Sequence, residues 1–234
     1  VNAFHMNKGE FYSRDINYKS WGYDNYYGLQ DIQKYDDERY VLDRELILNK
    51  TFYNKIFKQQ GNFVNYIITY SPHTPFTTEK EVGKILAEEK YGKGNVPKLS
   101  EEDCAKMAAS ETDNMVGLLI QALKDNGLYD NTVIVAYADH YLYTLDDKSI
   151  LDKYKETSNN LINHTPFFIW SSDLGQLTSI SKVNMQMDIL PTVLNLFGID
   201  YNSNNYIGHD ILSNDFKGYA FFSDYSWYDG KVYV

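Results

Sequence analysis

The chain has 234 residues, a hydrophobic content of 43% and a formal net charge of −10. These values describe a globular protein with a sizeable core and argue against disorder. An acidic chain repels nucleic acid and anionic lipid at long range, so no nucleic-acid partner is expected. The single cysteine, Cys104, rules out an internal disulfide. It lies on a predicted helix and is expected to be a small residue of the protein core.

The N-terminal segment, residues 1–40, is aromatic and polar and is expected to form loops and short helices. Apolar positions in the segment 43–58 predict a helix. Residues 62–70 (NFVNYIITY) are rich in β-branched and aromatic side chains, which predicts a buried strand. Two prolines within residues 71–76 end this strand.

The clearest helix is expected to begin after Ser100, a suitable N-cap followed by three acidic residues, and to end at the Asn126–Gly127 stop. Residues 132–138 (TVIVAYA) then form a continuous apolar run, which is typical of a central strand in a parallel sheet. The segment 144–163 is charged and polar and is expected to be a mobile excursion.

The last third of the chain predicts a strand over residues 165–170 and a helix over residues 187–197, with Phe221, Phe222 and residues 232–234 as possible edge strands. Together with the earlier elements, this order indicates an α/β fold. The strands are expected side by side in one mainly parallel sheet, flanked by the helices, and residues 1–234 are expected to form part of a single domain.

The adjacent pair Asp139–His140 is the sharpest local feature, because it follows the apolar run 132–138. Ligands of open α/β sheets gather at the carboxyl ends of strands, and a carboxylate beside an imidazole can bind a divalent cation. The alternative is an aspartate that caps a turn beside an exposed histidine. On spacing alone this alternative is favoured, because two ligands do not make a metal site.

A family resemblance changes that balance. Residues 127–134 (GLYDNTVI) leading into Asp139–His140, residues 186–199 (QMDILPTVLNLFGI) and residues 206–212 (YIGHDIL) resemble, in order, motifs of the alkaline phosphatase and sulfatase superfamily. The resemblance implies an alkaline-phosphatase-like fold, whose N-terminal part would lie upstream of Val1. It also implies that Asp139 and His140 bind a divalent metal. Manganese is the first choice, and magnesium, calcium and zinc remain open.

Two further stretches resemble the lipoteichoic acid synthase (phosphoglycerol transferase) branch. Residues 4–15 (FHMNKGEFYSRD) resemble a pattern that implies roles for Asn7, Tyr12 and Arg14 in binding a glycerophosphate head group. Such a role suits an arginine fork on phosphate and an aromatic wall on glycerol. Alternatively, Arg14 pairs with a surface carboxylate and Tyr12 lies in the core.

The second stretch, residues 70–76 (YSPHTPF), resembles the turn whose histidine faces the substrate phosphate. His73 could then donate a hydrogen bond to a phosphoryl oxygen or protonate a leaving alkoxide. It is expected to share one cleft with Arg14, Asp139 and His140. The remaining histidines, His5, His164 and His209, are expected to be structural or surface residues.

No segment resembles the family's nucleophile motif, so the catalytic nucleophile, expected to be a threonine, would lie upstream of Val1. The chain begins without a start methionine and contains no apolar run of transmembrane length. We therefore expect an excised, soluble and inactive fragment, whose parent is anchored at the extracellular face of a bacterial membrane.

The resemblance implies a metal-dependent phosphoglycerol transferase or phosphodiesterase that acts on glycerophosphate-containing polymers or lipids of the cell envelope. The substrate would be an anionic phosphodiester or, for the alternatives of a sulfatase or phosphonate monoester hydrolase, a sulfate ester or phosphonate. A non-catalytic surface domain that binds glycan is a third alternative. Substitutions in the family pattern, Met6, Tyr12 and Tyr141, indicate a shifted substrate preference.

Overall fold

The computed structural model describes residues 1–33, 39–155 and 162–234. The chain divides into two compact units. The first contains Val1–Val133 and His140–His164, and the second contains Ile134–Asp139 and Thr165–Val234. Part of the predicted excursion over residues 144–163 lies outside the described residues.

The first unit is built on a three-stranded parallel sheet with the order β2-β1-β3. Its strands are β1 (Asn2–His5), β2 (Asn25–Tyr27) and β3 (Asn65–Ile68). All three strands begin with an asparagine, and these asparagines are in register. The prediction of loops and short helices for residues 1–40 was therefore wrong for β1 and β2. Both strands are too short to show a periodic pattern. Pairing with β3 stabilises β1, and β2 in turn pairs with β1.

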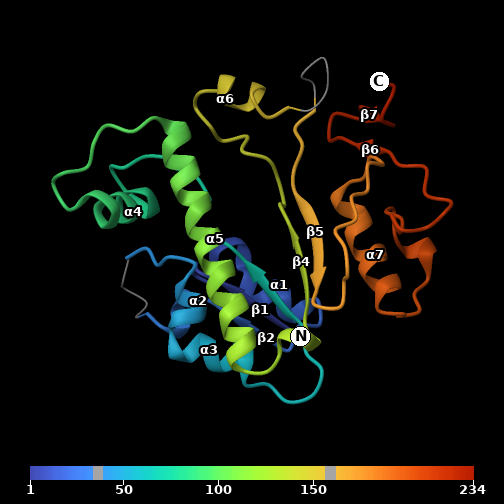
Figure 1. Ribbon diagram of the computed structural model, residues 1–234, viewed down its shortest axis with the longest axis horizontal. Coiled ribbons are helices and arrows are strands. Elements are labelled where there is room, and N and C mark those ends of the chain that lie inside the picture. Colours follow the sequence, from blue (N-terminus) through green and yellow to red (C-terminus); the bar gives the residue numbers. More distant parts are fainter. Residues whose placement is uncertain (34–38, 156–161) are drawn as a thin grey trace. The chain divides into compact units, whose positions relative to one another are not determined.

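Helix α5 (Glu101–Asp125) begins and ends where the sequence predicts. The Ser100 hydroxyl accepts a hydrogen bond from the Asp103 amide at 3.1 Å, and Gly127 adopts a left-handed φ of 66° after the helix. Figure 1 shows this long green helix beside α2, α3 and α4. Cys104 packs in a core cluster with Phe76, Ala108, Leu145 and Ile150, as expected.

The predicted helix over residues 43–58 is interrupted, giving α2 (Glu45–Leu48) and α3 (Lys50–Phe57). Asn49 takes an extended conformation between them, and its side-chain oxygen accepts a hydrogen bond from the Thr51 amide at 2.9 Å. An asparagine that can cap a new helix competes with continuation of the old one. The other helical segments of this unit are η1 (Phe11–Ser13), α1 (Arg14–Ser20), η2 (Leu29–Asp31), α4 (Glu81–Tyr91), η3 (Tyr129–Asn131) and α6 (Ser149–Asp152).

The second unit contains β5 (Phe167–Ser171) and its partner β4 (Val133–Tyr137), except that the first residue of β4, Val133, belongs to the first unit. Its other elements are η4 (Gln186–Asp188), α7 (Ile189–Leu196), η5 (Ser203–Asn205) and the antiparallel strands β6 (Ala220–Phe221) and β7 (Trp227–Tyr228). An isolated bridge joins Tyr228 to Tyr233, so the C-terminal residues do contribute β pairing.

The prediction that all three apolar strands share one sheet was wrong for the described residues. β3 pairs with β1, whereas β4 pairs with β5. Apolar patterning locates strands but does not encode which strands pair, because pairing depends on contacts distant in sequence. The α/β class and the parallel direction of the first sheet were predicted correctly.

The motif over residues 186–212 ties α7 to the following turn. The buried Asp188 carboxylate accepts hydrogen bonds from the amides of Met185 at 3.0 Å and His209 at 2.7 Å. The Thr192 hydroxyl donates to the Asp188 carbonyl and accepts from the Ile211 amide. Gly208 lies so close to the Met187 carbonyl that a Cβ would be 1.9 Å from its oxygen. These residues therefore fix main-chain geometry.

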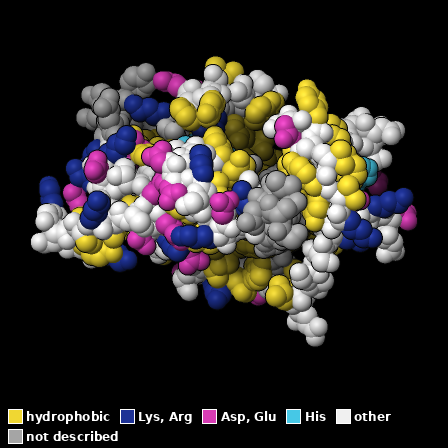
Figure 2. Space-filling view, turned by 90° about the horizontal axis from the view of Figure 1, so that it is seen from above, with side chains coloured by type: hydrophobic (Ala, Val, Ile, Leu, Met, Phe, Trp, Pro, Cys, Tyr) yellow, Lys and Arg dark blue, Asp and Glu magenta, His cyan; other side chains and the backbone are white. Residues whose placement is uncertain are grey.

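Hydrophobic side chains remain exposed in the second unit, and Figure 2 shows such side chains gathered at the surface. In β5, for example, Phe168 is 53% exposed, whereas Phe4 in β1 is 0% exposed. The large hydrophobic residues exposed in this unit include Phe168, Leu174, Leu177, Met187, Leu190, Leu196, Phe197, Ile199 and Ile207.

No helix in the described ranges is long and apolar enough to cross a membrane.

Candidate functional site

Two of the predicted site residues, His73 and His140, come together in the first unit. His73 lies in the turn that follows β3, and His140 follows the apolar run that contains β4. The ring centroids are 6.3 Å apart, with an angle of 82° between the ring planes. Residues distant in sequence therefore place two imidazoles edge to face.

The hydrogen bonds of both histidines define which ring nitrogen carries the proton. Nδ1 of His73 is 2.9 Å from the Thr74 carbonyl oxygen, and Nδ1 of His140 is 2.8 Å from the Tyr141 carbonyl oxygen. A carbonyl oxygen only accepts, so Nδ1 carries the proton in each ring. In the neutral rings Nε2 then carries the lone pair, which suits metal binding or proton transfer.

Aromatic neighbours support both rings. His73 stacks on Tyr70 with a centroid distance of 6.3 Å and an interplanar angle of 6°, and Tyr143 meets His140 at 5.0 Å. Tyr70 also contacts His5 at 5.8 Å. His5 is 3% exposed, and its Nδ1 lies 2.9 Å from the Ile68 carbonyl, which agrees with the structural role expected for it.

The turn that carries His73 is held by Asp43, a residue that the sequence analysis missed. The fully buried Asp43 carboxylate accepts hydrogen bonds from the Tyr70 amide at 2.8 Å and the Ser71 amide at 2.8 Å. The Asp43 amide in turn donates to the Ser71 hydroxyl at 3.0 Å. Burial raises the pKa of Asp43 to about 6, against the hydrogen bonds from Tyr70 and Ser71, which lower it.

Arg14, Tyr12 and Asn7 lie on the segment that follows β1. The Arg14 guanidinium carbon is 5.3 Å from the Tyr12 ring centroid and 5.7 Å from that of Phe11. Tyr12 is 73% exposed, so it does not lie in the core, and its φ of 58° places it in the left-handed region. Left-handed backbone in a non-glycine residue is strained and is frequent at ligand sites. This segment thus presents a guanidinium beside two aromatic rings that contact each other.

Arg14 and Tyr26 both have buried polar atoms without hydrogen-bond partners among the described residues. These atoms are Nη1 of Arg14 and the hydroxyl oxygen of Tyr26. Burial raises the pKa of Tyr26 to about 12, and the nearby Arg14 charge opposes this shift. Leaving a buried charged donor unpaired is costly, and buried polar groups in native proteins are nearly always bonded. Arg14 is therefore suited to an anionic ligand.

Strand direction relates these segments to one another. β1 and β3 are parallel neighbours, and His5 at the end of β1 is in register with Ile68 at the end of β3. Asn7 and His73 both follow these carboxyl ends, where ligands of parallel sheets are usually bound. The Asn7 side-chain oxygen accepts a hydrogen bond from the Lys8 amide at 2.7 Å. That Arg14 shares one cleft with His73 and His140 stays a prediction.

Asp139 is exposed at the end of β4 and belongs to the second unit, whereas His140 belongs to the first. Within the described ranges, no three His, Cys, Asp or Glu side chains are grouped as a complete metal site would require. The tautomer of His140 fits a metal ligand, and the exposed carboxylate of Asp139 is a suitable oxygen donor. His164 and His209 are exposed, as expected for surface residues.

Comparison with known proteins identifies the class. Residues 1–199 match the sequence model of the family described as Sulfatase, and the chain belongs to this family.

Among individual proteins, the chain is similar to the lipoteichoic acid synthase of Staphylococcus saprophyticus, with 29% identity over 248 residues. It is also 29% identical over 253 residues to that of Staphylococcus aureus strain USA300. Both matches cover 99% of the chain but 36% of the relative.

A solved structure supports the same branch. The lipoteichoic acid synthase LtaP from Listeria monocytogenes superposes with a TM-score of 0.75 and 26% sequence identity. The match covers 97% of the chain and 57% of LtaP. The alkaline-phosphatase-like fold and the resemblance to lipoteichoic acid synthases, both predicted from motifs, are thereby confirmed. The chain spans about a third of the length of these curated relatives.

Proposed function

We propose that the chain is part of a metal-dependent phosphoglycerol transferase or phosphodiesterase that acts on glycerophosphate-containing polymers or lipids of the bacterial cell envelope. The observation that carries this proposal is the pair of neighbouring imidazoles, His73 and His140, each with Nε2 free of the proton. The relatives, which are lipoteichoic acid synthases, support the substrate class.

In the proposed site, His140 and Asp139 hold a divalent metal, with manganese as the first choice. The metal would polarise the phosphoryl group and activate a nucleophile. His73 lies beside His140 and serves the phosphoryl group, either by hydrogen bonding to its oxygen or by moving a proton at Nε2. The Asp43 carboxylate holds the turn that carries His73, so His73 keeps its orientation during the reaction.

Arg14, Tyr12 and Asn7 bind the glycerophosphate group in this proposal. The guanidinium of Arg14 offers two parallel donors to a phosphate, and its Nη1 lacks a partner among the described residues. Tyr12 is exposed beside the guanidinium, where its ring can pack against the carbons of glycerol.

We propose that the nucleophile and the remaining metal ligands lie outside these 234 residues, because the curated relatives are almost three times as long as the matched region. The parent protein would act at the extracellular face of a bacterial membrane. Covalent catalysis without its nucleophile loses many orders of magnitude in rate, so the chain alone should be inactive.

The test is hydrolysis of bis(p-nitrophenyl) phosphate and of p-nitrophenyl sulfate with added manganese, by the chain alone and by a longer protein with the upstream region. The proposal would be supported if the longer protein, but not the 234-residue chain, hydrolysed the phosphodiester and if Asp139→Ala abolished that activity. Preference for the sulfate ester would favour a sulfatase instead. Turnover by the 234-residue chain that disappears in Asp139→Ala would show that the nucleophile lies within it.

A further inference from the structure

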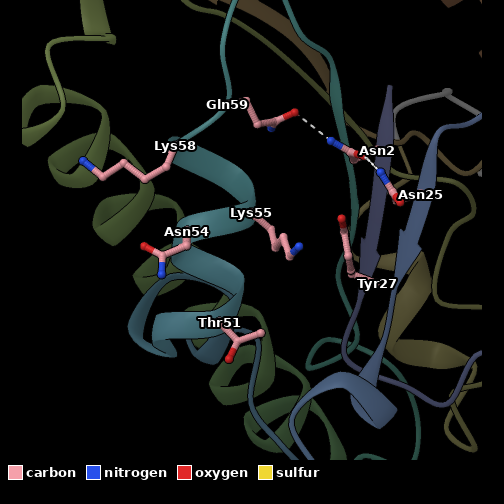
Figure 3. A pocket seen from close by; sticks show the side chains of 8 residues that line it. All are labelled: Asn2, Asn25, Tyr27, Thr51, Asn54, Lys55, Lys58 and Gln59. Carbon is pink, nitrogen blue, oxygen red and sulfur yellow. Dashed lines mark hydrogen bonds between the residues drawn. The ribbon is translucent and has the colours of Figure 1, made fainter.

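A cavity of about 640 Å³ lies at the edge of the first sheet that is opposite to His73. Its strand wall is made by Asn2, Asn25 and Tyr27, and its helix wall includes Thr51 and Lys55 of α3 and Gln59 just beyond it (Figure 3). Asn2 and Asn25 begin parallel strands, whereas His73 follows the end of another. The cavity is therefore separate from the proposed catalytic site, and its ligand does not depend on the reaction proposed there.

A chain of amide hydrogen bonds crosses this edge, and its direction is fixed at one end. The Ile56 carbonyl oxygen accepts from Asn65 Nδ2 at 3.0 Å and from Gln59 Nε2 at 3.2 Å. Because a carbonyl only accepts, both amide nitrogens are assigned. Gln59 Oε1 then accepts from Asn2 Nδ2 at 2.7 Å, and Asn2 Oδ1 accepts from Asn25 Nδ2 at 2.8 Å.

This series of hydrogen bonds ends at Asn25, whose side-chain oxygen is left as an acceptor at the cavity. Figure 3 shows Asn25 as the last residue of the dashed path from Gln59 through Asn2. Asn25 is exposed, whereas Asn2 is only 7% exposed. The side-chain oxygen of Asn25 can accept a hydrogen bond, and a hydroxyl group of a ligand can donate it.

A positive charge faces the same space. Lys55 Nζ lies 5.2 Å from the Tyr27 ring centroid, and Figure 3 shows Lys55 extended toward the strands. Lys58, just beyond the end of α3, also lines the cavity, but Figure 3 shows its side chain directed away from the strands, and its Nζ is 2.5 Å from Asn126 Oδ1. None of the eight lining residues is acidic, in a chain with a net charge of −10. The cavity thus presents a positive charge with no carboxylate among its lining residues.

We propose that this cavity binds a phosphorylated sugar. Its phosphate pairs with the Lys55 ammonium, a hydroxyl group donates to Asn25 Oδ1, and the ring face of Tyr27 packs against sugar carbons. The volume is in the range of small-molecule sites. The combination of an exposed amide acceptor, a lysine and an aromatic wall distinguishes this ligand from a bare anion and from a neutral sugar.

The test is a titration of the full chain, labelled with nitrogen-15, with glucose 6-phosphate, glucose and inorganic phosphate. We expect glucose 6-phosphate to shift the side-chain amide signals of Asn2, Asn25 and Gln59. It should bind at least about tenfold more tightly than either fragment, because only it makes both contacts. Equal affinity for inorganic phosphate, or no shift of these signals, would overturn the proposal.

Two matched lysine variants, one in α3 and one at its C-cap, distinguish a specific contact with the ligand from a general effect of positive charge. Lys55→Gln should weaken binding of glucose 6-phosphate by about tenfold or more, whereas Lys58→Gln should change it by less than about twofold. Lys19→Gln should leave it unchanged, because Lys19 is an exposed residue of α1 that does not line the cavity. Equal losses in the two lysine variants would mean that the cavity does not select the ligand.

Discussion

The amino ends and the carboxyl ends of the strands in the first sheet carry different kinds of polar residue. We call these two sides of the sheet its amino edge and its carboxyl edge. At the amino edge, side-chain amides bond to one another from Asn65 to Asn25. At the carboxyl edge, His73 keeps Nε2 free, and Arg14, on the segment after β1, has a buried nitrogen without a described partner. The same strands thus support one edge where most side-chain amides bond to one another, up to the exposed Asn25, and another where the Arg14 nitrogen is buried without a described partner.

The largest expected effect is at the carboxyl edge. His140→Ala in the longer, active protein removes a proposed metal ligand and should lower phosphodiester turnover by at least about 100-fold. The measurement is the steady-state rate with saturating manganese. His164→Ala is the control, because His164 is exposed and has no role in the proposed site. Similar rates in both variants would remove His140 from the mechanism.

Arg14→Gln should act mainly on substrate binding. Loss of the guanidinium removes two charge-assisted hydrogen bonds to phosphate, so KM for a glycerophosphate substrate should rise by about tenfold or more. The control is Lys19→Gln, which removes an exposed charge from the same helix, α1. A KM that does not change in Arg14→Gln would argue that Arg14 is a surface residue without a phosphate contact.

Asp43→Asn tests the support beneath the carboxyl edge. The amide has one acceptor where the carboxylate has two, so a buried backbone donor loses its partner. The free energy of unfolding should fall by about 1–3 kcal/mol, measured by urea denaturation. Asp113→Asn on the exposed face of α5 is the control, and its effect should be within about 0.5 kcal/mol. Equal stabilities of the two variants would contradict the role of Asp43.

The stability contribution of Asp43 should also depend on pH. Its pKa is about 6 in the folded chain against an ordinary value of 3.8, so the folded state binds more protons between these values. Stability from this group therefore falls as pH rises from about 4 to 6, by at most about 3 kcal/mol, and is constant above. The difference in the free energy of unfolding between the wild-type chain and Asp43→Asn should accordingly be larger at pH 4.5 than at pH 7.5.

The smallest effect is expected at the amino edge. Asn25→Ala removes the exposed end of the amide chain and should cost less than about 1 kcal/mol of stability, because water can replace the lost hydrogen bond. Asn2→Ala should cost more, because Asn2 is buried and leaves Gln59 unbonded on one side. If thermal denaturation showed equal losses of stability in Asn25→Ala and Asn2→Ala, the side-chain amides would contribute independently of one another.

Local features of the fold could be predicted from the sequence, whereas pairing between distant segments could not. The limits of α5 follow from a capping serine and a terminal glycine that act within one turn. The strand at residues 2–5 has no local signal and exists because β3 pairs with it. The sheet partner of β4 depends likewise on residues far along the chain.

The same limit applies to the site. His73 and His140 could be named from motifs, since the resemblance covers the residues around them. Asp43 could not, because its importance comes from hydrogen bonds to a turn 27 and 28 residues away. The unpaired nitrogen of Arg14 likewise depends on what surrounds it in three dimensions.

The motif over residues 186–212 has a consequence for recognising relatives. Asp188 and Thr192 bind main-chain groups of α7 and the turn at residues 208–212, and Gly208 leaves no room for a side chain. Selection to keep this motif follows from the need to fold, whatever reaction the protein performs. A descendant that had lost its catalytic groups would retain it. Genome surveys that rely on this motif will therefore collect active enzymes and inactive descendants alike, and the proposed catalytic residues, His73 and His140 among them, are needed to separate them.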